Sequence, residues 1–146
     1  MRHVALTVVV VAIALVGFHA TPAFAQQVDA LAPLQGRWVV TGGEHNAESM
    51  DSLNGGVMTV DGPAFEIRTA SGNMLTGTLA GDASMRPHHL ELLHADGTRW
   101  EAVFDVAGAT LRLNYVDASG LDPRPTGFKT SATNEESLIV LRREDR

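Results

Sequence analysis

The chain lacks cysteine entirely. Disulfide bonds are therefore excluded, even in a compartment that would permit them, and so is a lipid anchor attached through a cysteine. Basic residues are also few, with 11 Lys and Arg against 17 Asp and Glu in 146 residues. This balance disfavours nucleic acid and anionic membranes as partners. Stability must come from a hydrophobic core, and a chain of this length can bury one.

Motifs for catalysis are missing as well. The sequence contains no Gly-x-Ser-x-Gly elbow, and no glycine-rich phosphate loop precedes a helix-like segment. No spacing singles out a pair of carboxylates suited to glycoside hydrolysis. We therefore predict that the protein is not an enzyme, that it uses no cofactor and that it has no catalytic residue.

The N-terminus has the pattern of a secretory signal. Arg2 and His3 form a short basic start, residues 4–18 are an apolar run, and residues 23–25 supply the small-x-small pattern that signal peptidase cleaves. The apolar run is shorter than the roughly 20 residues that span a bilayer. We predict a cleaved signal peptide over residues 1–25 and a periplasmic or secreted protein. An uncleaved N-terminal anchor is the alternative.

The remainder is long enough for one domain and not two. Residues 26–33 are polar and rich in alanine, so we expect a flexible lead-in. From Gly36 onward, apolar and polar residues alternate and turn residues recur every eight to twelve positions, which is typical of antiparallel sheets. Strands are expected over 37–41, 57–60, 64–69, 74–80, 89–92, 99–106, 111–115 and 137–142.

The apolar faces of these strands are expected to fill a common interior. Eight strands with one apolar face close naturally into a barrel, which removes exposed edges, and sequential hairpins favour an up-and-down order. A two-sheet sandwich is the alternative. Small residues at Ala102, Thr76 and Thr78 leave room for a modest pocket. The predicted inward residues are Trp38, Val40, Phe65, Ile67, Leu90, Leu92, Trp100, Phe104, Leu111, Leu113 and Tyr115.

Four short motifs occur in an order that is known from one protein family. Residues 34–38 read Leu-x-Gly-x-Trp, residues 108–111 read Gly-x-x-Leu, residues 124–128 read Arg-Pro-x-x-Phe, and residues 138–143 form an apolar strand that ends in arginines. In this order they resemble the uncharacterised lipocalin-like domains that are abundant in planctomycete bacteria. The resemblance implies an all-β, lipocalin-like barrel over residues 34–143, with no established activity.

The resemblance also implies how one end of the barrel closes. In lipocalins a tryptophan at the position of Trp38, two residues after Gly36, packs across one end, often against an arginine near the last strand. Arg142 is the expected partner, with Arg124 as the alternative, and its guanidinium would stack on the indole. We assign Gly36, Trp38 and Arg142 to barrel closure.

The sequence gives less information about the ligand-binding site than about the fold. Pro123 and Pro125 stiffen the chain around Arg124, which suits a guanidinium that holds a carboxylate or phosphate. An internal ion pair, with Phe128 as a plug, is the alternative. We predict binding of a small apolar or amphipathic molecule by a monomeric protein. The candidate ligand-binding residues are Arg124, Phe128, Trp100, Phe104 and Tyr115.

Histidines are the candidate metal ligands, and their spacing is weak. His89 and Glu91 point to the same side of one predicted strand, and His45 could add a third group. His88 and His94 share a strand face but stand too far apart to hold one ion. We interpret these residues as a solvated strand face and predict no metal site.

Two long connections support a different function. Residues 42–56 and 117–128 interrupt the strand pattern, and long connections in compact domains are often functional. The alternative to ligand binding is therefore an envelope protein-interaction module or a protease-inhibitor-like barrel that acts through these loops. A filled barrel interior would favour the loops, whereas an open apolar cavity would favour a small ligand.

Overall fold

The computed structural model describes residues 30–145, so the predicted signal peptide lies outside the described residues. Between Ala30 and Asp145, no helix is long and apolar enough to cross a membrane. Two short 3-10 helices occur, η1 (Ala32–Leu34) and η2 (Asp51–Leu53). The strands are β1 (Gly36–His45), β2 (Glu48–Ser49), β3 (Val57–Asp61), β4 (Ala64–Arg68), β5 (Met74–Asp82), β6 (His88–His94), β7 (Arg99–Ala107), β8 (Thr110–Asp117) and β9 (Ser137–Arg143).

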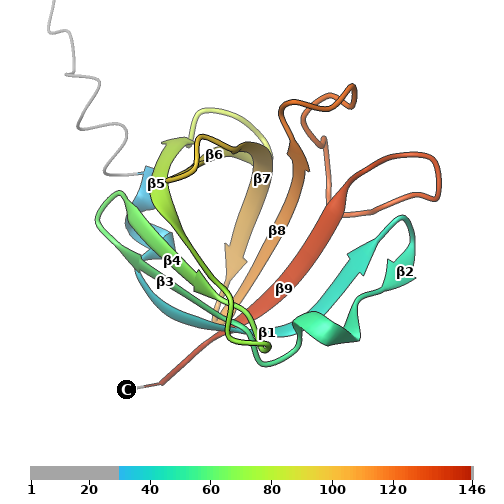
Figure 1. The fold of residues 1–146 in the computed structure, drawn as a ribbon. Helices are drawn as coiled ribbons and strands as arrows, with labels where there is room; N and C mark the ends of the chain where they lie inside the picture. Colours follow the sequence, from blue (N-terminus) through green and yellow to red (C-terminus); the bar gives the residue numbers. More distant parts are fainter. Residues whose placement is uncertain (1–29, 146) are drawn as a thin grey trace, which may run out of the picture.

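Eight of these strands close into an antiparallel barrel. Each strand from β3 to β8 pairs with the next one along the chain, and β1 completes the ring by pairing with both β3 and β9 (Figure 1). The short β2 lies outside the ring, because it pairs only with the last residues of β1. The prediction of an all-β, eight-stranded up-and-down barrel is confirmed.

The long connection expected at residues 42–56 is shorter in the structure. Gly42 to His45 continue β1 after a bulge that follows Val40, and β2 and η2 occupy much of the rest. The second connection is longer than expected and runs over residues 118–136. We call this second segment the strap.

The barrel has two ends, because neighbouring strands run in opposite directions. The end that we call the closed end carries the start of β1, the turns at 62–63 and 108–109, and the end of β9. The opposite end, which we call the mouth, carries the end of β1, the turns at 69–73 and 95–98, and both ends of the strap.

The interior is a continuous apolar cluster. All eleven residues predicted to face inward belong to it or pack against it, which confirms the strand parity used for them. Thr76 and Thr78 are a correction, since both are exposed and the inward positions of β5 are Leu75, Gly77 and Leu79. The space expected beside the two threonines is therefore on the outside of the barrel.

The closed end is built around Trp38, whose side chain is 0% exposed. Its Nε1 donates a hydrogen bond to the carbonyl of Leu34 at 2.8 Å. The guanidinium stacked on the indole, 4.1 Å from the ring centre, belongs to Arg143, which corrects the assignment to Arg142 or Arg124. The reason is parity, because Ile139 and Leu141 face inward and Arg143 lies on their side of β9, whereas Arg142 is exposed.

The residues just before β1 also belong to the packed fold. Of the expected lead-in, the structure describes residues 30–33, and it buries both Ala30 and Leu31. They lie against β5 at Gly81, where an added Cβ would stand 3.0 Å from Ala30 and 3.2 Å from Leu31. Arg143 ties this segment down by donating to the carbonyls of Pro33 and Gln35.

The strap covers part of the outer wall. Val103 of β7 and Val116 of β8 point away from the barrel interior, yet they are 0% and 1% exposed. Asn114, also on this outer face, donates to the carbonyl of Gly127 and to Glu136, both at 2.8 Å. The strap thus adds a small second core outside the barrel.

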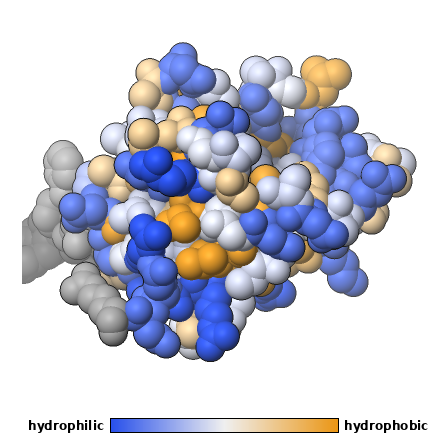
Figure 2. All heavy atoms as spheres, turned by 60° about the horizontal axis from the view of Figure 1, so that its bottom comes forward, coloured by the Kyte–Doolittle hydropathy of each residue, from blue (hydrophilic) through white to orange (hydrophobic). Residues whose placement is uncertain are grey.

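The rest of the described surface is largely polar. Figure 2, which brings the bottom of Figure 1 forward, shows a small apolar area surrounded by hydrophilic side chains. Four large hydrophobic side chains are exposed among residues 30–145, and they belong to different strands and loops: Met74, Met85, Leu93 and Leu121.

Candidate functional site

The five predicted ligand-binding residues do not form one site. Trp100 and Tyr115 lie on the inner wall near the mouth and are partly buried. Phe104 is fully buried in the interior, where its ring meets His88 edge to face at 5.4 Å. Arg124 and Phe128 belong to the strap on the outside of the barrel.

Arg124 serves to fasten the strap. Its Nη1 donates to the carbonyls of Leu90 and Ala102 at 2.8 and 2.9 Å, and its Nη2 reaches Glu91 at 3.2 Å. Phe128 is likewise engaged, because the guanidinium of Arg112 lies 4.2 Å from the centre of its ring. The structure therefore matches the internal ion pair that was the alternative for Arg124.

A run of four rings crosses the inner wall, from Trp100 and Tyr115 at the mouth to Phe65 near the turn at 62–63 of the closed end. Tyr115 stacks on Trp100 with 4.2 Å between ring centres and 16° between planes. Trp100 meets His94 at 4.2 Å, and His94 meets Phe65 edge to face at 5.3 Å. These rings come from β8, β7, β6 and β4. We call Phe65, His94, Trp100 and Tyr115 the aromatic arc.

The wall beside the aromatic arc is polar. Strand register places Tyr115 opposite Ser137, and Ser137 opposite His45. Ser137 hydrogen-bonds Nδ1 of His45 at 2.9 Å, and Glu135 lies 3.6 Å from Nε2 of the same ring. Burial raises the pKa of the Tyr115 phenol, and a hydrogen bond with Ser137 opposes the shift. We call His45 and Ser137 the polar rim.

One side of the mouth is partly covered. Leu53 of η2 packs on β1 at Gly43, where an added Cβ would stand 3.1 Å from its side chain. Ile67 and Leu53 are partly buried against the core cluster. The mouth therefore combines an apolar covering, the aromatic arc and the polar rim within one ring of strands.

His94 is the unusual member of the aromatic arc. His94 is only 5% exposed, and its Nε2 has no hydrogen-bond partner among the described residues. Burial lowers the pKa of His94, while the carboxylates of Asp96 and Asp117 oppose that shift. Burial therefore disfavours the charged form of the ring, since that form would lose its solvation.

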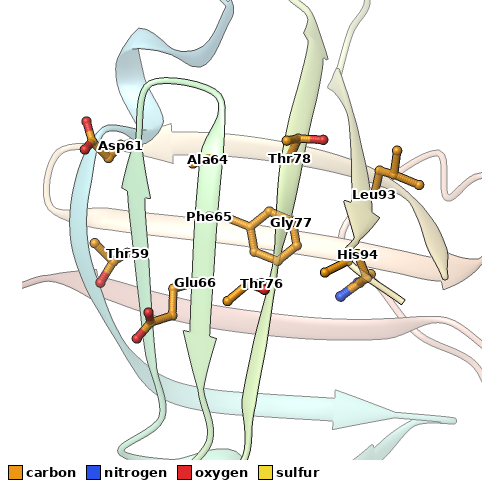
Figure 3. Close-up of a pocket in the computed structure, with 11 residues that line it drawn as sticks. Thr59, Asp61, Ala64, Phe65, Glu66, Thr76, Gly77, Thr78, Leu93 and His94 are labelled. Atoms are coloured by element: carbon orange, nitrogen blue, oxygen red, sulfur yellow. The ribbon is translucent and has the colours of Figure 1, made fainter. Parts of the chain in front are cut away.

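An open groove of about 730 Å³ lies on the outer face of β3 to β6. Figure 3 shows its two outer rows of side chains, with the row of Phe65, Gly77 and His94 between them. We call it the outer groove. Its upper row in Figure 3 is Asp61, Ala64, Thr78 and Leu93, and its lower row is Thr59, Glu66 and Thr76.

The sequence candidates for a metal are not brought together. Glu91 pairs with Arg124, and His45 is bonded to Ser137 on a different part of the barrel wall. In the part of the chain that the structure describes, no three His, Cys, Asp or Glu side chains are placed to hold one ion.

Comparison with known proteins adds little beyond the fold. No protein-family model matches the chain, and no curated protein matches it. The resemblance to planctomycete lipocalin-like domains therefore stays a prediction. One similar solved structure is a de novo designed fluorescence-activating β-barrel, with 18% identity, 80% of this chain and 99% of that chain covered, and a TM-score of 0.46. A likeness of this degree says nothing about what this chain binds.

Reasoning from sequence assigned no role to Arg143 or Ser137, and it considered His94 and His45 only as metal ligands. Strand parity alone would have placed His94 inward, two positions after Leu92, and Arg143 inward, two positions after Leu141. The pairing of His45 with Ser137 needed the register of β1 against β9, which includes a bulge. No local sequence signal gives that register.

Proposed function

We propose that this barrel binds a small, flat, amphipathic molecule at its mouth. The observation that carries the proposal is the aromatic arc, in which Trp100 and Tyr115 are stacked yet only partly buried. A flat apolar ring can pack against the exposed part of these two rings, and such aromatic pairs contribute about 0.5–1.5 kcal/mol beyond their area. The polar rim next to Tyr115 offers His45 and Ser137 to the polar part of the same molecule.

The filled interior limits where such a ligand can lie. Trp38, Phe104, Leu90 and Leu111 are among the side chains that are at most 1% exposed inside the barrel. Native interiors of this kind are packed as densely as organic crystals. The ligand therefore rests against the mouth and does not descend toward the closed end. This favours a compact molecule over a long acyl chain.

The proposal is tested by titrating the protein with N-phenyl-1-naphthylamine and following the fluorescence of the probe. We expect Trp100→Leu to weaken binding about two- to tenfold, in line with the loss of one stacking partner. Leu93→Ala is the matched control, because Leu93 is 49% exposed in the outer groove. Weakening by Leu93→Ala and not by Trp100→Leu would place the ligand in the outer groove and refute the mouth.

A second function is favoured by one specific observation. Leu121 at the tip of the strap is fully exposed, and exposed apolar side chains on rigidly fastened loops suit protein contacts. An interaction module acting through the strap and residues 42–56 is thus the alternative. It is tested by comparing pull-downs from envelope extract with the wild type and with Leu121→Asp. Equal recovery of every captured protein would count against the strap as an interface.

Export is a separate proposal, and it rests on residues 1–25. We expect the protein isolated from an envelope fraction to begin at Gln26. Intact mass spectrometry checks this directly. A mass that includes the first 25 residues would favour the uncleaved anchor.

A further inference from the structure

The ring nitrogen Nε2 of His94 is one of three buried side-chain polar atoms in residues 30–145 that have no hydrogen-bond partner, together with Oδ1 of Asn46 and Oδ1 of Asn114. Buried polar atoms in folded proteins are nearly always hydrogen-bonded, and an exception calls for a specific cause. An unmade hydrogen bond in the interior costs about 1–3 kcal/mol. His94 has no such bond from Nε2, although it lies on the inner wall between Trp100 and Phe65.

The ring of His94 lies beside Trp100, and it also lines the outer groove. His94 lies between Phe65 and Trp100 in the aromatic arc, so its ring adjoins Trp100, the ring that we expect a ligand to contact. Phe65 on its other side is 3% exposed, whereas Trp100 is only partly buried. Trp100 is thus the more accessible of the two rings that flank His94.

We infer that the ligand of this mouth carries a hydroxyl group that hydrogen-bonds Nε2 of His94, so that its class is a flat aromatic alcohol. This inference rests on the proposed function. A hydroxyl fits either tautomer of the imidazole, because it donates to a bare nitrogen and accepts from an N–H. A carboxylate is disfavoured, since it can only accept and would bring an unpaired charge into the apolar arc.

The test compares 2-naphthol with naphthalene, which differ by the hydroxyl alone. Isothermal titration of the wild-type chain should give tighter binding of 2-naphthol, by about three- to tenfold, from one added hydrogen bond. Naphthalene is the more hydrophobic probe, so burial of apolar area alone predicts the opposite order. In a parallel fluorescence titration, binding of the probe should quench the emission of Trp100. Trp100→Phe should abolish this quenching.

His94→Phe is the decisive variant, because it keeps a ring in the aromatic arc and removes the nitrogen. We expect it to lose the preference for 2-naphthol and to bind naphthalene at least as tightly. His88→Phe is the matched control, since His88 lies on the same strand and the same face but packs on Phe104. It should keep the preference for 2-naphthol. His94→Gln, which restores a polar group, should recover part of the preference.

The outcomes separate this inference from the proposed function. Equal binding of both probes by the wild type would overturn the hydroxyl contact and leave the mouth as the binding site. A preference that persists in His94→Phe would also overturn it. Failure of a folded wild-type protein to bind either probe would count against the mouth itself. Circular dichroism of each variant confirms that the barrel has formed.

Discussion

At the scale of single residues, position on a strand decides what each side chain does. Arg142 and Arg143 are neighbours with the same chemistry, yet one is exposed and the other stacks on Trp38. Arg143 also donates to the carbonyls of Gln35 and Pro33 at 2.6 and 2.8 Å. One step along β9 therefore separates a solvated arginine from one that holds the closed end together.

Arg143→Ala is expected to destabilise the barrel by about 1–3 kcal/mol, from the lost cation–π contact and two carbonyls left without their donor. Arg142→Ala is the paired control and should change stability by less than about 0.5 kcal/mol. Urea unfolding followed by tryptophan fluorescence measures both. Equal effects of the two variants would mean that parity does not set the role of these arginines.

Gly77 is the residue where β5 leaves no room for a side chain. An added Cβ would clash with the carbonyl oxygen of Leu93 and stand 2.8 Å from Phe65 and 2.9 Å from His94. Gly77→Ala should therefore cost about 1–3 kcal/mol, as overpacking does, and should weaken probe binding because it displaces the aromatic arc. Gly42→Ala is the control, since nothing lies within 4 Å of its added Cβ. Thermal unfolding that shifts equally in both variants would contradict this packing.

At the scale of elements, the strap is a structural fastening. Arg124 joins it to two strand carbonyls and to Glu91. We expect Arg124→Gln to lower stability by about 1–3 kcal/mol, since these acceptors lose a charged donor. Binding of 2-naphthol by the folded variant should be unchanged. If Arg124→Gln folds stably but no longer binds 2-naphthol, Arg124 would instead be a ligand-binding residue.

The sequence predicted strands better than it predicted sites, and the reason is physical. Alternation is a local signal, so it located the eight barrel strands and the inward set from Trp38 to Tyr115. It failed at Thr76 and Thr78, because Gly77 carries no side chain to mark the inward face of β5. The ligand candidates were chosen by residue type, which cannot tell that Arg124 lies on the outer wall while Trp100 lies on the inner one.

Contacts between distant segments were beyond the sequence for a second reason. The pairing of β1 with β9 joins residues that are nearly 100 positions apart, and the bulge after Val40 shifts its register. Only this register brings His45 against Ser137. The polar rim is therefore a property of barrel closure and not of any motif.

At the scale of the whole molecule, the two ends of the barrel differ in kind. The closed end is sealed by η1, Trp38 and Arg143, and the interior above it is filled. The mouth keeps two partly buried rings and one unpaired buried nitrogen. Such departures from full packing and pairing tend to lie at functional sites.

The stability of the whole barrel should depend on pH through His94. Its folded pKa lies below the ordinary value of 6.5, so the unfolded chain binds more protons between the two values. Stability is then fully present above pH 6.5 and falls as the pH drops toward the folded pKa. The carboxylates of Asp96 and Asp117 face the ring and moderate this loss.

The check is urea unfolding of the wild type and of His94→Phe between pH 5 and 7.5. We expect the unfolding free energy of the wild type minus that of His94→Phe to fall as the pH drops below 6.5. His88→Phe should show no such trend. A difference that is constant across this range would mean that His94 titrates alike in the folded and unfolded chains.

The central claim is that this barrel binds at its mouth. Amide and indole chemical-shift mapping with 2-naphthol tests it most directly. We predict that the largest shifts fall on Trp100 and Tyr115, with little change at Thr59 or Thr78 in the outer groove or at Gly127 in the strap. Shifts confined to the outer groove or to the strap, with Trp100 unmoved, would contradict the account.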